Sequence, residues 1–351
     1  MKKFLTNERN HKFLVPILSV LFGFLAGAII MIFTGINPLD GYRALVKGVL
    51  GNPRKFGEWI VVSTPLMFTG LAVAFGFRTG LFNIGAEGQL IMGSLAAVAV
   101  GILVKMPKII HLPLALLAAA VVGALWAFIP GILKAKFKVH EVVVTIMLNY
   151  TALHLVNYGI KILPGSTNTR TVNINSTASL SSEFLSKLTS HSRLHWGFVV
   201  AFIAALTFWY IIEKTTFGYE LRAVGFNPHA SEYAGMKVNR NIVLSMMISG
   251  AFAGLAGAMI SIGTFDYARV IGGFEGYGFD GIAVALLGNN SGLGIVISAF
   301  LFGALKAGSS AMALAAVPKE IANIIMAFIV LFAAMNYGIK MFLLRLGKEE
   351  K

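Results

Sequence analysis

The chain has 351 residues, of which 57% are hydrophobic and 13% are charged, and its mean hydropathy is +0.78. A water-soluble domain with this composition would expose large apolar patches, so the composition excludes a soluble protein and indicates a lipid bilayer as the solvent. The formal charge of +14 would suit nucleic acid, but the basic residues border the apolar runs, as is typical of membrane orientation. The chain has no cysteine and its seven histidines are scattered along it, so we expect neither disulfides nor a metal site.

Apolar segments follow one another along the chain, and most have about the 20 residues needed to cross a hydrocarbon core. They are continuous rather than alternating, which predicts helices and not a barrel. The first follows a basic stretch and lacks a small-residue cleavage site, so we interpret it as a transmembrane helix rather than a signal peptide. The segments are Phe13–Phe33, Trp59–Phe77, Phe82–Val104, Leu112–Leu133, Val142–Leu163, Trp196–Ile212, Ile242–Ile262, Ile295–Val317 and Ile321–Leu344.

A further apolar run, Phe279–Leu287, is too short to cross as a straight helix and is either a half-helix or a re-entrant segment. If it also traverses, four basic clusters fall on one side, which predicts ten crossings with both termini in the cytoplasm. The fold class is therefore all-α, a polytopic transmembrane bundle of eight to ten crossings with one broken or short helix. The clusters are Lys2, Lys3, Arg9 and Lys12; Lys134, Lys136 and Lys138; Lys214, Arg222, Lys237 and Arg240; and Lys340, Arg345, Lys348 and Lys351.

This topology leaves four basic residues outside the cell, contrary to the rule that basic residues gather on the cytoplasmic side of a membrane protein. They are Arg43, Lys47, Arg54 and Lys55. The stretch Leu39–Leu50 near them is amphipathic, and we expect it to lie on the membrane surface. Its lipid-facing residues would be Leu39, Tyr42, Val46, Val49 and Leu50.

The longest polar connections are residues 164–195, predicted to be an external loop, and residues 213–241, predicted to be cytoplasmic. No linker between them is long or polar enough to separate domains. We therefore expect residues 1–351 to form a single membrane domain with a transmembrane core over residues 13–344.

A weak internal repeat links the two halves of the chain. Residues 80–85 (GLFNIG) open one apolar segment and residues 278–282 (GFDGI) open another, each with a phenylalanine between two glycines and a polar residue directly after it. Paired glycine-interrupted segments of this kind mark the substrate path in many transporters. The alternative is that the glycines only allow close helix packing.

Polar residues inside the apolar segments are the candidate path residues. Asn83, Glu87 and Gln89 open one helix, and Asp280 lies in the short segment. A carboxylate at membrane depth costs at least about 2.5 kcal/mol, so Glu87 and Asp280 should face a cavity or a partner. A structural ion pair between Glu87 and Arg78 is the alternative for the first of them.

A polar stripe follows one face of the segment after residue 140. Its members recur at helical spacing, and they either line a pore or bond to a neighbouring helix. Lys306, inside another apolar run, could extend its charged end to an interface. The stripe consists of Glu141, Thr145, Asn149 and Asn157.

The cytoplasmic connection contains a short isolated helix, predicted over Pro228–Ala234. Asn227 is a good N-cap, Pro228 suits the first turn, and Gly235 is placed to end the helix. A short helix held below a bundle is a docking element, and an ordinary solvated loop is the alternative.

At this point the sequence resembles the permeases of ABC importers for branched-chain amino acids, ribose-type sugars and nucleosides. The resemblance rests on RTGLFNIGAEGQLIMG, KFKVHEVVVTIMLNY, FGYELRAVGFNPHASEYAGM and GYGFDGIAVALLG, in order over nearly the whole chain. The form GLFNIGAEGQ is similar to the nucleoside branch, whereas sugar permeases carry a version with aspartate and serine. The long loop 164–195 departs from the family pattern.

The resemblance implies a cell-membrane permease subunit that moves nucleosides, with sugars or branched-chain amino acids as alternatives. It implies three partners: an ABC ATPase that uses the ATP, a second and often non-identical permease, and an extracellular binding lipoprotein. It also implies that residues 220–236 contain the coupling helix. The chain has no GxxxxGK[ST] loop, so we expect no bound cofactor and no enzyme activity of its own.

Two rival hypotheses remain: an ion-coupled transporter in which Glu87 or Asp280 relays protons, and a membrane scaffold that transports nothing. Dependence of uptake on a partner ATPase discriminates them from an ABC permease.

We assign two sets of candidate residues. The predicted substrate-binding residues are Phe82, Asn83, Glu87, Gln89, Asn149, Phe279 and Asp280. The predicted ATPase-coupling residues are Glu220, Arg222, Asn227, Pro228, Glu232 and Gly235.

Overall fold

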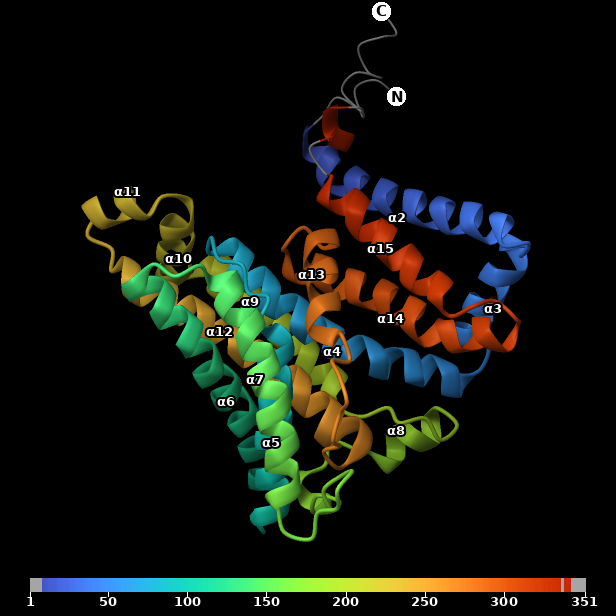
Figure 1. Cartoon of the computed structure of the whole chain (residues 1–351), viewed down its shortest axis with the longest axis horizontal. Coiled ribbons are helices and arrows are strands. Elements are labelled where there is room, and N and C mark those ends of the chain that lie inside the picture. Colours follow the sequence, from blue (N-terminus) through green and yellow to red (C-terminus); the bar gives the residue numbers. More distant parts are fainter. Residues whose placement is uncertain (1–7, 336–337, 342–351) are drawn as a thin grey trace, which may run out of the picture.

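The computed structural model describes residues 8–335 and 338–341, and these are predominantly helical (Figure 1). Most of the two terminal basic clusters used above for orientation lie outside the described residues. Eight described helices are long and apolar enough to cross a membrane, and two shorter apolar helices, Tyr277–Leu287 and Glu320–Ala334, accompany them. The chain is therefore a polytopic helical bundle, consistent with about ten crossings.

The helices follow the predicted apolar segments in order. A π-helix, η2 (Met259–Phe265), continues α12, and a 3-10 turn, η1 (Ser176–Ala178), lies in the long loop. The α-helices are α2 (Glu8–Phe33), α3 (Pro38–Leu50), α4 (Pro53–Arg78), α5 (Ala86–Leu103), α6 (Lys108–Phe137), α7 (Glu141–Ile162), α8 (Glu183–Leu188), α9 (Gly197–Lys214), α10 (Thr216–Phe226), α11 (Pro228–Tyr233), α12 (Val238–Ala258), α13 (Tyr277–Leu287), α14 (Gly292–Leu314) and α15 (Glu320–Ala334).

Helix α4 forms the centre of the molecule. Its residues 63–76 are all buried, and it packs against α9, α12, α13 and α14. Figure 1 shows it running between a group containing α5, α6, α7, α9 and α12 and a second group containing α2, α3, α14 and α15. Such a helix, apolar on every side, is expected only in the interior of a membrane bundle.

Small residues bring some helices into backbone contact. A side-chain carbon added at Gly123 of α6 would lie 2.3 Å from the carbonyl oxygen of Gly250 in α12, and one at Gly254 would lie 2.2 Å from that of Ala119. Helix association in lipid depends on this close approach, because no hydrophobic effect drives it.

The prediction for Leu39–Leu50 is only partly right. Helix α3 exposes Leu39, Val46 and Leu50, but Val49 is buried and Tyr42 is half-buried, with its hydroxyl donating to the carbonyl of Phe24. Gly48 lets the helix approach α14 closely and Gly41 packs on Met31 of α2, so two of the five predicted lipid-facing residues point inward. Helix α15 ends at Ala334, and the last part of the predicted apolar segment, residues 342–344, lies outside the described residues.

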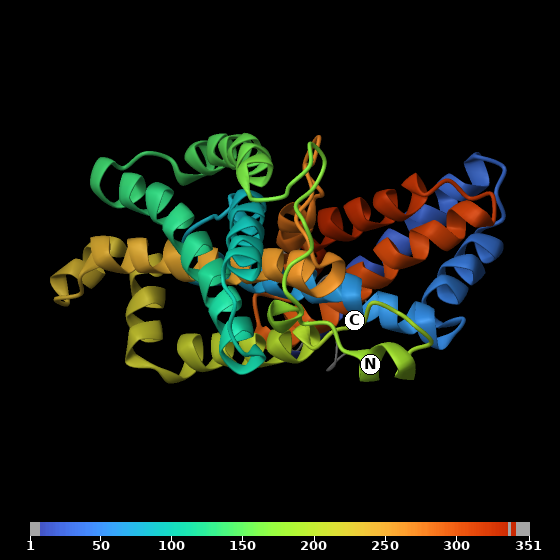
Figure 2. The same ribbon diagram turned by 90° about the horizontal axis from the view of Figure 1, so that it is seen from below.

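The two long polar connections lie at opposite ends of the molecule. Figure 1 places α11 and the first turns of α2 at one end, and α8 of the long loop at the other. Within that loop, an extended stretch runs beside the segment after η2 (Figure 2), and the amides of Thr171 and Val270 donate to the carbonyls of Ala268 and Thr169 at 2.9 and 2.8 Å.

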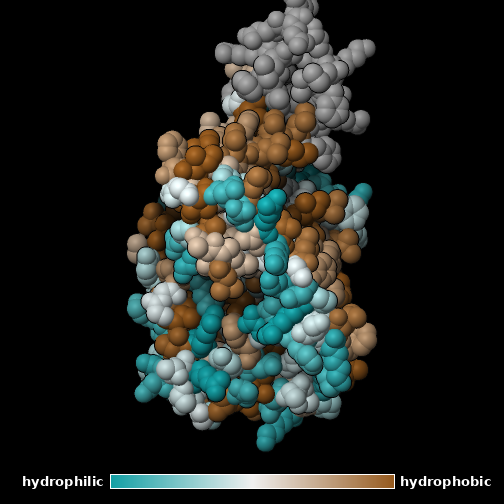
Figure 3. Space-filling view, turned by 90° about the vertical axis from the view of Figure 1, so that its right-hand side faces the viewer, coloured by the Kyte–Doolittle hydropathy of each residue, from teal (hydrophilic) through white to brown (hydrophobic). Residues whose placement is uncertain are grey.

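The outer surface carries lipid-facing stripes. On α2, Ile17, Leu21, Leu25 and Ile29 are exposed at intervals of four residues. Figure 3 shows hydrophobic side chains gathered over the upper part of this side of the molecule and hydrophilic ones toward its lower end. This distribution fits a body embedded in lipid with its polar connections in water.

Candidate functional site

The two glycine-interrupted segments that the internal repeat pairs are in direct contact. Gly278, at the start of α13, packs on the backbone of Ala86 and Glu87 at the start of α5, where an added side-chain carbon would lie 2.3 Å from the Glu87 nitrogen. Both openings therefore meet at one point in the bundle, and glycine is required there for the backbones to approach.

Glu87 joins these segments. Its side chain is 1% exposed, and its two carboxylate oxygens accept hydrogen bonds from the amides of Gly276 at 2.9 Å and Gly278 at 2.5 Å. A carboxylate at the first turn of α13 satisfies amides that the helix leaves unpaired. The alternative pairing with Arg78 is wrong, because Arg78 pairs with Glu213 of α9.

Asn83 and Gln89 form a closed buried network with Ser249 of α12. The Asn83 amide nitrogen donates to Gln89 Oε1 at 2.8 Å and to Ser249 Oγ at 2.7 Å. Its oxygen accepts from the Gly85 amide at 2.9 Å and from Gln89 Nε2 at 3.1 Å. Because these polar atoms bond to one another, they hold the turn between α4 and α5 in shape in this conformation.

The polar stripe of α7 bonds to neighbouring segments. Asn149 accepts from the Gly88 amide at 2.8 Å and donates to the Ile84 carbonyl at 3.1 Å, and Asn157 bonds in both directions to the backbone of Ile271. Of the two alternatives left by the sequence, Asn149 and Asn157 thus show bonding to a neighbouring segment, whereas the Thr145 hydroxyl donates within its own helix. Phe82, next to this region, stacks on Phe77 with ring centres 5.1 Å apart.

A groove of about 630 Å³ opens between α13, α14 and α15, and two predicted residues, Phe279 and Asp280, line it. Phe279 is 38% exposed. Asp280 pairs with Lys306 of α14 at 2.7 Å, and the Lys306 ammonium also lies 3.9 Å from the centre of the Tyr277 ring. The groove thus combines an aromatic face, an ion pair and, from α15, the amide of Asn323.

Sequence reasoning did not assign Lys306 or Asn323 to the site. The available signal was that Lys306 and Asp280 are lone opposite charges in adjacent apolar segments. A charge at this depth needs a partner, so the pairing had a physical reason, but the helix geometry was needed to identify it.

The short helix predicted within residues 213–241 is present. The Asn227 side chain accepts from the Ala230 amide at 3.0 Å, Pro228 begins α11, and Gly235 has the positive φ of +82° expected beyond a helix end. The helix ends at Tyr233, one residue before the prediction, and Glu232 is exposed. Two aromatic residues not predicted as site residues, Phe226 and Tyr233, are 90% and 95% exposed.

Helix α10 packs on the bundle through buried Leu221 and Val224, whereas α11 is mostly exposed. Arg222 pairs with Glu213 at 3.4 Å, and Glu220 accepts from the Asn241 amide nitrogen at 3.1 Å. Gly225 packs directly on Gly80, where an added side-chain carbon at either glycine would lie 2.5 Å from the other segment's backbone. The short helix therefore leads directly to the turn that positions Asn83 and Glu87.

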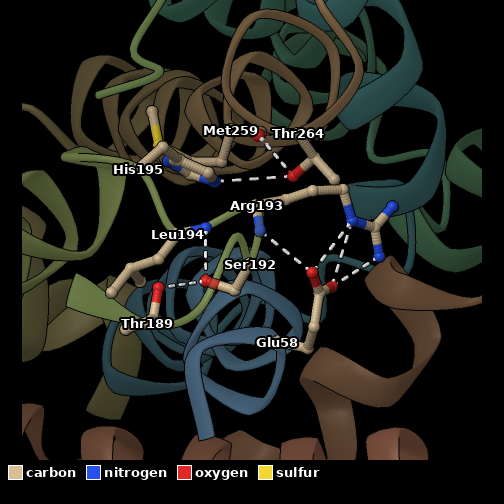
Figure 4. Close-up of polar contacts among 8 residues, drawn as sticks. All are labelled: Glu58, Thr189, Ser192, Arg193, Leu194, His195, Met259 and Thr264. Carbon is tan, nitrogen blue, oxygen red and sulfur yellow. Dashed lines mark hydrogen bonds and ion pairs between the residues drawn. The ribbon is translucent and has the colours of Figure 1, made fainter. Parts of the chain in front are cut away.

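The external loop is anchored at its end. Arg193 donates to Glu58 of α4, with Nη2 and Nε at 2.6 and 3.0 Å from Oε2 (Figure 4). Beside it His195 is buried, with Nδ1 accepting from the Gly197 amide at 3.1 Å. Burial, together with the neighbouring Arg193 charge, lowers the pKa of His195 to about 4, so the imidazole is neutral near pH 7.

The described residues contain no group of three or more histidine, aspartate or glutamate side chains that could hold a metal ion.

Comparison with known families gives a match over residues 56–334 to the family described as branched-chain amino acid transport system, permease component. The chain belongs to this family. With its membrane-spanning helices, it is a permease subunit of an ABC importer.

Several curated proteins are similar to this permease. It is 54% identical to the guanosine ABC transporter permease protein NupP of Bacillus subtilis, over 97% of this chain and 99% of the relative. It is 39% identical to the nucleoside permease protein NupB of Lactococcus lactis, over 96% and 94%, and 33% identical to the glucose permease protein TsgB13 of Haloferax volcanii, over 90% and 86%. No solved structure matches it.

Proposed function

We propose that this permease imports nucleosides, driven by ATP that partner subunits hydrolyse. Two relatives named for guanosine or nucleosides cover nearly the whole chain at 54% and 39% identity, which supports this substrate over the glucose of the 33% relative. The observation that carries the mechanism is the backbone contact between Gly225 and Gly80, because it joins the short α11 segment to the candidate path.

The groove chemistry suits a neutral solute with a ring and hydroxyl groups. A nucleobase can stack on the exposed face of Phe279, while Asp280 and Asn323 accept and donate hydrogen bonds to ribose or base edges. A volume of about 630 Å³ lies within the range of small-molecule sites. Phe82, Asn83, Glu87, Gln89 and Asn149 stay predicted contacts for a conformation in which the turn opens.

A second permease subunit completes this path. The Asp280 and Lys306 side chains are 28% and 27% exposed, in a groove on the outside of the bundle. Charged groups that face lipid at membrane depth are costly, so a protein surface should cover them. The path then runs between two subunits, and the family resemblance favours a non-identical partner.

Coupling begins at α11. An ATPase that docks on α10 and α11 moves them when it binds ATP, and the Gly225–Gly80 contact passes this movement to the turn before α5. Glu87 bonds this region to the first turn of α13, so the groove residues Phe279 and Asp280 move with it. During this movement, Glu220 and Arg222 keep α10 attached to α12 and α9.

This mechanism fixes the orientation. The α11 end of the molecule and both chain termini lie in the cytoplasm, and residues 164–195 face outside, where the binding lipoprotein delivers its solute. The positive charges of residues 214–240 agree with this side assignment.

Uptake of labelled guanosine by cells that express the permease with its ATPase, second permease and lipoprotein tests the proposal. We expect ATP-dependent uptake that excess unlabelled nucleoside competes away and glucose does not. Phe279→Ala and Asp280→Asn should reduce it strongly, whereas Leu21→Ala on the lipid-facing stripe of α2 should leave it unchanged. Uptake without the ATPase, or of glucose in preference to guanosine, would contradict the proposal.

A further inference from the structure

A second groove lies on the outer surface, where the end of α6 meets the start of α12. It has a volume of about 380 Å³ and lies beyond the close glycine contacts of these two helices. Its walls are apolar, with Phe128 and Ile132 from α6 and Val243 and Met247 from α12. Phe128 is exposed and continues the lipid-facing stripe of Leu117, Val121 and Leu125, so the groove opens to the bilayer.

Two cations stand at the mouth of this groove. Lys136 and Arg240 are both exposed, and neither forms an ion pair with an acidic residue in the described part of the chain. Nearby cations behave differently, since Lys134 pairs with Glu141 at 2.7 Å and Arg222 with Glu213 at 3.4 Å. Positive charge is therefore available at the end of an apolar groove, at the level where the helices leave the membrane.

We propose that this groove binds an anionic phospholipid, with an acyl chain between α6 and α12 and the phosphate at Lys136 and Arg240. Basic pockets between transmembrane helices at the cytoplasmic side recognise anionic head groups in this way. A soluble anion such as phosphate would need the two cations but would leave the apolar walls of the groove unused. A neutral lipid would fill the walls but would leave the two positive charges without a counterion.

The position of the site connects it to coupling. Arg240 also lines a neighbouring cavity, about 370 Å³ in volume, with Tyr219, Glu220 and Gly235 of the α10–α12 region. A phosphate bound at Arg240 would neutralise the charge beside these residues. If the proposed function holds, the ATPase activity of the assembled importer rises with the fraction of anionic lipid.

Native mass spectrometry of the full-length permease measures the binding directly. The protein is mixed with phosphatidylglycerol or phosphatidylcholine of identical acyl chains, and bound lipid is counted. We expect selective retention of phosphatidylglycerol, and about 30-fold weaker retention by the double variant Lys136→Gln, Arg240→Gln. The matched control, Lys105→Gln with Lys108→Gln, removes the same charge at the opposite end of α6 and should retain the lipid.

Two further variants keep the test decisive if the double variant is unstable. Lys136→Arg with Arg240→Lys preserves both charges and should bind normally, whereas Val243→Trp fills the groove without changing charge and should lose binding. Equal retention of the two lipids, wild-type retention by Lys136→Gln with Arg240→Gln, or displacement by inorganic phosphate would overturn the proposal. None of these outcomes depends on transport, so failure here leaves the proposed function standing, and the reverse also holds.

Discussion

The external loop and the cytoplasmic connection are both polar segments between membrane-spanning helices, yet they are held very differently. The external loop, residues 164–195, has little regular structure, but Arg193 bonds to α4 and buried His195 contacts the region of η2. The cytoplasmic connection is helical, but its aromatic residues Phe226 and Tyr233 are almost fully exposed. Order in the backbone and attachment to the bundle are therefore separate properties here.

This difference indicates where movement enters the molecule. The external loop contributes contacts that fix one end of α4, while α11 presents a free surface and reaches the bundle through α10, which packs on it with Leu221, Val224 and Gly225. A segment with exposed anchors and few attachments is suited to transmit a partner's movement. Mutations at the two ends can therefore separate transmission at this end from stability at the other.

The largest effect should come from Gly225→Val. The first carbon of the new side chain would lie 2.5 Å from the Thr79 carbonyl carbon and 2.7 Å from the Gly80 nitrogen, too close for contact, so α10 must shift and uptake should fall to background. Gly272→Val is the matched control, because nothing lies within 4 Å of its added carbon. Wild-type uptake by Gly225→Val, measured at equal membrane abundance, would remove this contact from the mechanism.

Phe226→Ala with Tyr233→Ala should weaken the association with the ATPase by about 2 kcal/mol or more, since exposed aromatic residues are typical interface anchors. The thermal stability of the isolated permease should change by less than about 0.5 kcal/mol, because both side chains are in solvent. Co-purification with the ATPase and thermal unfolding measure the two quantities. If the double variant lost thermal stability but still bound the ATPase normally, these two residues would stabilise the permease and would not be its ATPase-binding surface.

His195 predicts an acid-sensitive external anchor. Its folded-state pKa of about 4 lies below its ordinary value of 6.5, so the unfolded state binds a proton first as the pH falls. The stability due to neutral His195 is complete above about pH 6.5 and decreases as the pH falls toward 4, by on the order of 2 kcal/mol at pH 5. Unfolding of His195→Gln as a function of pH should lack this part of the slope.

The smallest effect is expected from the Glu58–Arg193 pair. Arg193 is half-exposed, so a double-mutant cycle with Glu58→Gln and Arg193→Gln should give a coupling energy of about 1 kcal/mol or less. Association with the ATPase should be unchanged in all three variants. A coupling energy of several kcal/mol would mean that the external anchor is far stronger than a solvent-exposed ion pair.

Local signals explain what the sequence predicted correctly. The α11 helix was predictable because Asn227, Pro228 and Gly235 act within a few residues of one another. The membrane-spanning helices followed from uninterrupted apolar runs in the same way. The prediction for α3 failed at Val49, because close packing of Gly48 on α14 turns this residue inward, which the amphipathic pattern alone does not show.

Distant contacts explain what the sequence could not give. The need of Glu87 for a partner was foreseen, but its partners are the amides of Gly276 and Gly278, about 190 residues away. The pairing of Asp280 with Lys306 and the closed network of Asn83 likewise depend on how helices cross. Backbone amides carry no sequence signal, so such partners become visible only in the fold.

The chain has no cysteine, so a single Phe279→Cys reports on the groove alone. The most direct measurement is its rate of reaction with a water-soluble thiol reagent in the assembled importer, with and without a non-hydrolysable ATP analogue. The rate should change when the analogue binds, and the change should disappear when Gly225→Val is added, while Phe184→Cys on α8 stays constant. A reaction rate that is the same with and without the analogue would contradict transmission from α11 to the groove. So would a rate change that is equally large when Gly225→Val is present.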